Sequence, residues 1–481
     1  MRTTKIAVAE PFSGRPKINL AAIFGATPEK PFLLRIPATG ERPMSFEVNG
    51  LPEGLELKDN IISGISPKVG EYEITLIAKN ALGQCEKRIT LEIKPQNVLV
   101  TPLLGFTSWN AYGSDVTQAD ILTAADRMVK LGLTEYGYRY VNTDSGWQYE
   151  YGGEFDAVMP NSKFPDMKQM TDTIHGYGLK CGIYSTPMLT AWGCPKEFKS
   201  IPGCTVGEPD YRFSDKNGGI GVIHKEANNV RQWDAWGFDY LKYDWSPCDT
   251  INADIMRKEL IKARRDFGFC VTIQALRPYG KYWSEYCHSY RCNDDSRGTW
   301  EFVLKIYNSY FGFQRFAKKG HYFDLDMLDC GTCKGEALEG VLTEDEQIVA
   351  YTMRAFLNSP IQISSTLEAV DEFELSLYCN EEIIAINQDT AFSTPKLVKK
   401  VEQGREKLHI FEKLLEDGRY AYAVFNIGEN ERETELEFES EADLRDAWAK
   451  ENIGNLNALT LKMAPHTVRV IKSDKKLMVE E

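Results

Sequence analysis

Short runs in which apolar and polar residues alternate fill the first 97 positions of the chain. Examples are "MSFEVNG" at 44–50 and "EYEITLIAKN" at 71–80, and turn signals such as NG and LG separate the runs. Alternation of this kind is typical of half-buried strands. The pattern predicts a small β-sandwich over residues 1–97. The segment shows no cluster of acids, His or Cys, so its expected role is packing or spacing.

From 98 to 390 the pattern changes, because strand-like runs alternate with amphipathic helical stretches. "FDYLKYD" at 238–244, for example, is followed by "INADIMRKELIKARRDFG" at 251–268. Eight strand-like runs occur here, most with a helix after them, which favours a (β/α)₈ barrel over residues 98–390. A doubly wound open sheet is the alternative, but no GxGxxG motif follows a first strand.

Strand patterns return in the last part of the chain. "KLHIFEKLL" and "YAYAVFNIG" flank "EDGR", which has the form of a hairpin turn. Two further alternating runs follow, so residues 391–481 are expected to form a C-terminal antiparallel β domain packed on the barrel. The predicted fold class is therefore multidomain α/β, with a TIM barrel between two β domains.

Composition narrows the possible partners. The 481 residues are 43% hydrophobic and 26% charged, as in an ordinary globular protein, and the net charge is −14. That charge argues against nucleic acid or an anionic membrane surface as a partner.

No apolar run reaches the roughly 18 residues of a membrane helix. The first residues lack the apolar centre of a signal peptide, so the protein is either cytosolic or has lost a signal.

The eleven cysteines are widely spread, and "CGTC" at 330–333 is the only CxxC. No second cysteine pair or histidine pair accompanies it at zinc spacing, so a loop disulfide or free thiols are favoured over a redox or zinc site.

Candidate chemistry gathers where the predicted barrel strands end, since barrel active sites lie at the carboxyl ends of the strands. These positions are Trp109, Asp144, Tyr184, Lys242, Asp244, Gln274, Arg291, Asp295 and Asp326. An aromatic platform with carboxylates, a Lys and an Arg suits a carbohydrate, which offers hydroxyls and a C–H face. A phosphate site would need Gly-rich loops and more cations. A metal site would need histidines, and none of the six falls at a strand end except His288, which starts a strand, so no metal is expected. No cofactor is implied either.

Two of the acids could form the pair that glycoside hydrolysis requires. Lys242 and Asp244 are two apart on one strand and share a face, which is either a surface ion pair or a carboxylate held ionised in a cleft. The second acid must hold a proton. Asp295, beside Asp294 and facing the first carboxylate, is the candidate.

Six motifs along the barrel resemble the α-galactosidase family, glycoside hydrolase family 27, in content and order. They are "GFTSWNAYG", "YRYVNTDSGWQ", "FPDMKQMTDTIHGYGLKCGIYS", "WGFDYLKYDW", "YRCNDDSRGTW" and "FDLDML". The resemblance covers roughly residues 103–390. Residues 15–43 also resemble the small Ig-like module that precedes such barrels in Bacteroidetes enzymes, and this relationship implies a periplasmic or secreted location.

The resemblance implies specific roles. The nucleophile that ends the "YLKYD" strand is Asp244, and the acid/base between an Arg and a Trp is Asp295. The sugar-contacting positions of the family fall on Trp109, Asp144, Tyr184, Lys242, Gln274, Arg291 and Asp326.

The catalytic residues of the family pattern are kept, and the departures from it fall on residues expected to set the sugar specificity. The family's adjacent acids, "DDCW", read "DSGW" here, so Ser145 replaces an acid that contacts sugar hydroxyls. Gly146 replaces the cysteine of that motif. The region that usually supplies the disulfide partner of this cysteine also lacks a cysteine. Ser246 stands where a cysteine usually follows the nucleophile, although Cys248 is near and could pair with Cys194 or Cys204. The usual "WNDPDML" is "YFDLDML".

The sequence therefore predicts a retaining exo-glycosidase acting on terminal α-galactose or a stereochemically matching sugar. A β-L-arabinopyranosidase is the nearest enzymatic alternative, because that sugar is galactose without its C6 arm. An α-glucan-acting enzyme and an α-N-acetylgalactosaminidase are further alternatives. Two alternatives of another class are a catalytically silent sugar-binding barrel and a glycan-binding N-terminal sandwich. The carbohydrate is the expected partner, and neither the aglycone nor the oligomeric state follows from the sequence.

Overall fold

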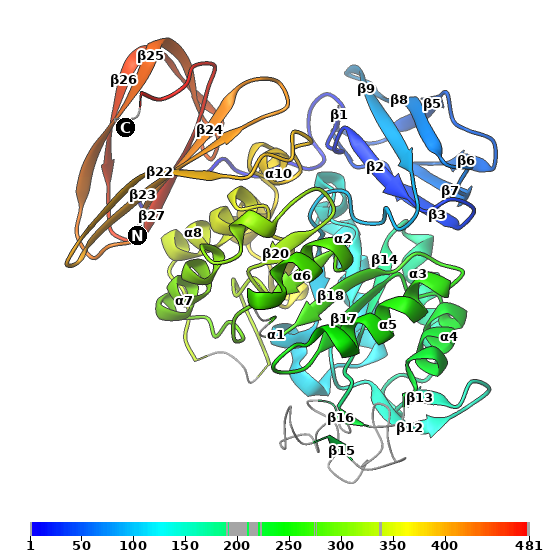
Figure 1. The fold of residues 1–481 in the computed structure, drawn as a ribbon. Helices are drawn as coiled ribbons and strands as arrows, with labels where there is room; N and C mark the ends of the chain where they lie inside the picture. Colours follow the sequence, from blue (N-terminus) through cyan, green and yellow to red (C-terminus); the bar gives the residue numbers. More distant parts are fainter. Residues whose placement is uncertain are drawn as a thin grey trace.

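The chain forms three β-containing parts, with the helices gathered in the central one (Figure 1). The computed structural model describes residues 2–188, 191, 209–210, 220–221, 224–273, 275, 277–335 and 339–478. Within those residues, no helix combines the length and apolar character that crossing a membrane requires.

The central part is an eight-stranded parallel sheet that curls into a TIM-like barrel. Its strands are β10 (Leu104–Thr107), β11 (Tyr140–Asn142), β14 (Lys180–Ser185), β17 (Tyr240–Asp244), β18 (Gly268–Thr272), β19 (Ser289–Arg291), β20 (Tyr322–Asp324) and β21 (Ile361–Ile363). They are ordered β20-β19-β18-β17-β14-β11-β10-β21. A parallel bridge between Leu328 and Ile363 joins the segment after β20 to β21. All eight strands coincide with the runs predicted from the sequence.

Helices cover the outside of this sheet, as expected for repeated strand–helix units. They are α1 (Trp109–Tyr112), α2 (Gln118–Lys130), α3 (Met167–Gly176), α4 (Glu226–Trp236), α5 (Thr250–Lys262), α6 (Gly280–Tyr286), α7 (Trp300–Tyr310), α8 (Glu344–Phe356), α9 (Glu372–Tyr378) and α10 (Glu381–Asn387). In α2, Thr117 and Asp120 form a capping box, and Ile121, Ala124 and Met128 lie on the buried face. The helix therefore begins at a side-chain cap and is held by one apolar stripe.

Two short hairpin-like sheets extend from the barrel loops. One pairs β12 (Gln148–Gly152) with β13 (Ala157–Pro160), and the other pairs β15 (Pro209–Asp210) with β16 (Ile220–Gly221).

The N-terminal part is built from small mixed sheets around its own apolar core. The strands are β1 (Lys17–Ile18), β2 (Ile23–Ala26), β3 (Pro31–Arg35), β4 (Ala38–Thr39), β5 (Ser45–Asn49), β6 (Leu55–Lys58), β7 (Ile61–Ile65), β8 (Gly70–Asn80) and β9 (Gly83–Ile93). They form sheets ordered β2-β9-β8-β5, β3-β7-β6 and β1-β4, and β2 pairs parallel with β9. The prediction of β structure is confirmed here.

The C-terminal part is one antiparallel sheet ordered β22-β23-β24-β27-β25-β26. Its strands are β22 (Lys396–Gln403), β23 (Glu406–Leu414), β24 (Tyr420–Asn426), β25 (Arg432–Asp446), β26 (Glu451–Met463) and β27 (Thr467–Ser473). The predicted hairpin joins β23 to β24, and their alternating residues bury one face against the barrel core.

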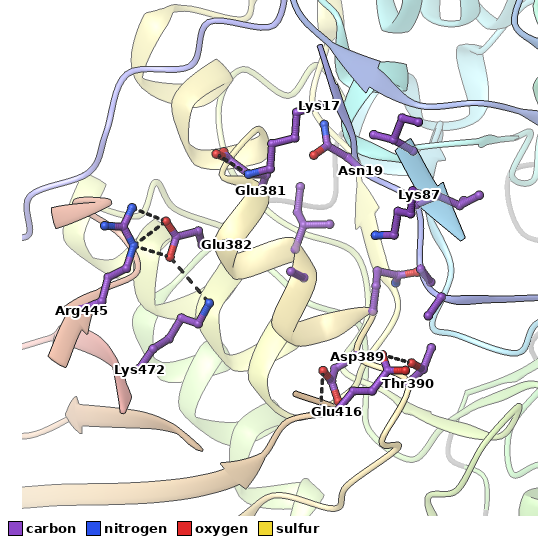
Figure 2. Close-up of a pocket in the computed structure, with 17 residues that line it drawn as sticks. Lys17, Asn19, Lys87, Glu381, Glu382, Asp389, Thr390, Glu416, Arg445 and Lys472 are labelled. Carbon is purple, nitrogen blue, oxygen red and sulfur yellow. Dashed lines mark hydrogen bonds and ion pairs between the residues drawn. The ribbon is translucent and has the colours of Figure 1, made fainter. Parts of the chain in front are cut away.

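All three parts meet around α10, beside a cavity of about 480 Å³ (Figure 2). Lys17 of the N-terminal part pairs with Glu381 at 3.1 Å. Arg445 and Lys472 of the C-terminal part pair with Glu382 at 2.6 and 3.9 Å. This short helix therefore ties both β parts to the barrel. The junction lies at the end of the barrel opposite the carboxyl ends of the strands.

Candidate active site

Nearly all of the predicted site residues lie where strands of the curled sheet end. Asp144 follows β11, Tyr184 lies in β14, Lys242 and Asp244 in β17, Arg291 ends β19, Asp295 follows it, and Asp326 follows β20. Trp109, half-buried, begins α1 directly after β10. Gln274 lies outside the described residues. Since parallel strands present their carboxyl ends at the same rim, residues far apart in the sequence come together there.

Asp244 is the carboxylate that ends β17. It is only 9% exposed, and its Oδ2 accepts a hydrogen bond from the Tyr184 hydroxyl at 2.8 Å. Its Oδ1 is buried and accepts no hydrogen bond from the described residues. Burial raises the pKa of Asp244 to about 6, against the opposing pull of the Lys242 and Arg291 cations. One oxygen is thus held in place while the other is available for chemistry.

Lys242 is placed differently from the sequence-based expectation. Its Nζ donates to Asp144 Oδ2 at 2.7 Å and lies 5.8 Å from the centre of the Tyr184 ring. The cation reaches across β14 to a strand two positions away. It still lowers the pKa of Asp244, but burial outweighs it, so the nucleophile candidate is not held strongly ionised.

Arg291 joins two acids that the sequence analysis singled out. The guanidinium is buried, with one nitrogen donating to Asp326 and another to Asp295. Burial opposes charge on Arg291, but Asp326 and Asp295 outweigh it and raise its pKa further. A planar guanidinium can hold two carboxylates in fixed directions at once.

Asp295 faces the solvent side of the site. Its side chain is 51% exposed, so neither burial nor Asp294, which instead pairs with Lys305 at 2.6 Å, encloses it as the sequence analysis expected. Asp295 is nevertheless among the charges that raise the pKa of Asp244. A buried carboxyl group and a half-exposed one therefore act on each other across the rim.

Residues missed by the sequence analysis hold the loop that carries Asp295. Asp329 accepts hydrogen bonds from Asn110, from the Ser296 hydroxyl and from the Gly298 backbone N–H. Burial raises its pKa to about 6. The only sequence signal was an acid three residues beyond Asp326, so a loop held from a neighbouring strand could not be inferred.

Comparison with known proteins places the chain in a family. The family model described as alpha galactosidase A matches residues 110–204 and 210–389. The chain belongs to this alpha-galactosidase family. A second model, the alpha galactosidase C-terminal beta sandwich domain, matches residues 405–473. The chain is therefore a glycosidase, as the sequence analysis predicted.

Individual members of the family are similar over most of their length. Alpha-galactosidase A of Cellvibrio japonicus is 27% identical over 412 residues, which cover 79% of this chain and 93% of that protein. A Bacteroides fragilis structure described as a candidate alpha-galactosidase/melibiase is 26% identical with a TM-score of 0.85, covering 96% of this chain and 98% of that one. A GH27 β-L-arabinopyranosidase of Geobacillus stearothermophilus, 23% identical with a TM-score of 0.67 and coverage of 78% and 96%, shares the fold.

Cysteines of this alpha-galactosidase-family chain are thiols wherever the structure describes them, including Cys330 and Cys333 of the CxxC. The Cys248 thiol lies 3.2 Å from the Trp245 carbonyl and 3.1 Å from that of Ile273. Its suggested partners, Cys194 and Cys204, lie outside the described residues.

Replacing Lys242 should shift the pH profile of the glycosidase. The Lys242 cation favours the ionised form of Asp244, so Lys242→Met should move the acidic limb of kcat/KM from near pH 6 to higher pH, by about one unit. Binding should weaken as well, because Asp144 loses its partner. The matched control is Lys180→Met, a lysine at the amino-terminal end of the neighbouring strand β14. An unmoved limb would mean that Lys242 does not tune Asp244.

Proposed function

We propose that the protein is a retaining exo-glycosidase that releases terminal α-galactose, with Asp244 as nucleophile and Asp295 as acid/base. The observation that carries the proposal is the buried Asp244 with one uncommitted oxygen, electrostatically coupled to a half-exposed Asp295. Asp244 attacks the anomeric carbon while Asp295 protonates the leaving oxygen. Asp295 then takes a proton from the water that releases the sugar, so two inversions give net retention.

A panel of nitrophenyl glycosides tests this function. The α-galactoside should be hydrolysed fastest, and proton NMR of the first product should show the α-anomer before mutarotation. A first product of inverted configuration would overturn the retaining mechanism. Binding of galactose without turnover of any panel member would favour the silent carbohydrate-binding alternative.

The remaining sugar-contacting positions complete a pocket for the glycone. We propose that Trp109 presents aromatic surface to the ring, while the polar groups of Asp144, Tyr184, Lys242, Gln274, Arg291 and Asp326 contact its hydroxyls. The Lys242–Asp144 pair and the Arg291–Asp326 pair support this, because charged groups already fixed to one another pay less entropy when they bind hydroxyls.

Ser145 gives the β-L-arabinopyranosidase alternative its specific support. The residue is fully buried, and its N–H donates to Asp144 Oδ1 at 2.8 Å, so position 145 adjoins a proposed sugar ligand. A carboxylate there would make charge-assisted bonds worth roughly 1.5–3 kcal/mol, against about 1 for a neutral bond. A serine is also shorter, which leaves room for a water or a different ring substituent.

Ser145→Asp should therefore shift preference towards α-galactosides. The expected change is about tenfold or more in the ratio of kcat/KM for the α-galactoside to that for the β-L-arabinopyranoside, since about 1.4 kcal/mol is a factor of ten. The matched control is Ser145→Asn, because asparagine has the size of aspartate without its charge. An unchanged ratio in Ser145→Asp would mean that position 145 does not read the sugar, and would turn attention to Phe323 and Leu325.

For the flanking parts we propose boundaries at 1–97, 98–390 and 391–481, with an Ig-like N-terminal module of the type found in Bacteroidetes enzymes. Its separate apolar core and the match to nearly the whole B. fragilis chain support this. Its proposed role is packing on the barrel, where Glu135 is buried between Arg35 and Arg42. Loss of glycan affinity on removal of residues 1–97, with the barrel still folded, would instead favour a glycan-binding module.

A further inference from the structure

The chain turns sharply where β20 ends, and Asp324 closes that turn. Asp326, two residues on, has a φ of 68°, in the left-handed region that few non-glycine residues adopt. Its backbone N–H donates to Asp324 Oδ1 at 2.9 Å. An aspartate that accepts from the N–H two residues later stabilises such a turn. The last residue of the strand therefore holds the backbone conformation of Asp326.

This turn directs the Asp326 carboxylate at Arg291. One oxygen accepts from Arg291, and the other accepts from the Ser296 backbone N–H at 2.6 Å. The second arm of Arg291 donates to Asp295, the one hydrogen bond that the Asp295 carboxylate makes in the described part of the chain. A continuous series of bonds thus runs from Asp324 through Asp326 and Arg291 to Asp295.

Asp324 itself lies deep in the barrel, where it is 2% exposed. Its second oxygen accepts from Gln362 Nε2 of β21 at 3.3 Å, and the Cys270 thiol of β18 lies 3.8 Å away. Burial raises the pKa of Asp324 to about 6, with Asp326 adding to the rise. Burying a carboxyl group in such an enclosed place costs free energy. The hydrogen-bond donors around Asp324 fix the direction of its side chain.

We propose that Asp324 is a positioning residue for the acid/base step: by closing the turn at Asp326 it fixes Arg291, and through Arg291 it aims Asp295 at the glycosidic oxygen. The inference rests on the proposed roles of Asp244 and Asp295. Asp324 acts only through Asp326. Its loss should therefore slow proton donation to the leaving group.

Two substitutions in the full chain separate this role from simple structural support. Asp324→Ala removes the acceptor of the Asp326 N–H, whereas Asp324→Asn keeps an oxygen for it and can offer its amide to the Gln362 oxygen. Activity is measured on two α-galactosides, one with a dinitrophenyl leaving group and one with methanol. Because general-acid catalysis contributes about 10²–10⁴-fold, Asp324→Ala should lose about 100-fold in kcat/KM on the methyl galactoside and at most about fivefold on the dinitrophenyl one. Asp324→Asn should restore most of that loss.

Asp239→Ala is the matched control, at the position directly before β17. Asp239 is equally buried and also accepts from a backbone N–H, that of Cys181 at 3.0 Å. Its loss should lower thermal stability without changing the ratio between the two substrates. Should Asp324→Ala fail to fold, Asp324→Ser, whose hydroxyl is a poorer acceptor at that distance, replaces it.

Equal losses on both substrates, or no rescue by Asp324→Asn, would overturn the positioning role. Asp295→Asn keeps the two hypotheses apart. If Asp295→Asn shows leaving-group dependence and Asp324→Ala does not, only the inference about Asp324 fails. If Asp295→Asn shows none, the proposed acid/base assignment itself fails.

Discussion

Asp244→Asn should abolish turnover, with a fall in kcat of about 10⁴-fold or more on a nitrophenyl α-galactoside. The amide is nearly the same size as the carboxylate, and its oxygen can still accept from the Tyr184 hydroxyl, which bonds Asp244 Oδ2 at 2.8 Å. It cannot attack the anomeric carbon, because it lacks the negative charge that the uncommitted Oδ1 of the parent offers. Galactose should still bind with a Kd within about tenfold of the parent's, as calorimetry would measure.

Asp249→Asn is the matched control for this loss. Asp249 lies five residues on, and its carboxylate caps α5 by accepting from the N–H groups of Ile251 and Asn252. An amide oxygen caps almost as well, so activity should change little. Parent-like activity in Asp244→Asn would end the proposal for the nucleophile.

Asp295→Asn should have the second-largest effect, and its size should depend on the leaving group. Substrates with poor leaving groups need a proton in the transition state, so they should lose about 10²–10⁴-fold in kcat/KM. An activated dinitrophenyl glycoside needs little protonation and should lose much less in its first step. The basic limb of the pH profile should also disappear, because it reports the acid's loss of its proton.

Asp294→Asn provides the control for Asp295, since the two acids are adjacent. Asp294 pairs with Lys305 at 2.6 Å, whereas Asp295 bonds Arg291. Kinetics of Asp294→Asn should match the parent on both classes of substrate. If the two variants behaved alike, the role of acid/base would not belong to Asp295.

Much of the candidate site followed from local pattern. The succession of strand-like runs and helical stretches predicted all eight barrel strands, and the ends of those runs predicted Asp144, Tyr184, Lys242 and Asp244 as site residues. This works because a strand's periodicity and its end are encoded by neighbouring residues, and parallel strands bring their ends to one rim. The β22 strand (Lys396–Gln403) was missed, because its exposed residues carry little apolar alternation.

The partners of these side chains did not follow from local pattern. Lys242 and Asp244 share a face, yet Lys242 bonds Asp144, 98 residues away in the sequence, across the intervening strand β14. The turn at Asp326, whose N–H is held by Asp324, has no periodic signature either. Which cation meets which carboxylate depends on how the curled sheet sets distances between strands.

The sequence by itself determined the element types, their order and the set of polar residues at the barrel rim. Only the tertiary structure decided that Asp244 is buried enough for its pKa to rise to about 6, and that Asp295 remains half-exposed on Arg291. The physical reason is that a residue's hydrogen-bonding and alternation preferences are local, whereas desolvation and Coulomb interaction sum over every group that the fold brings near.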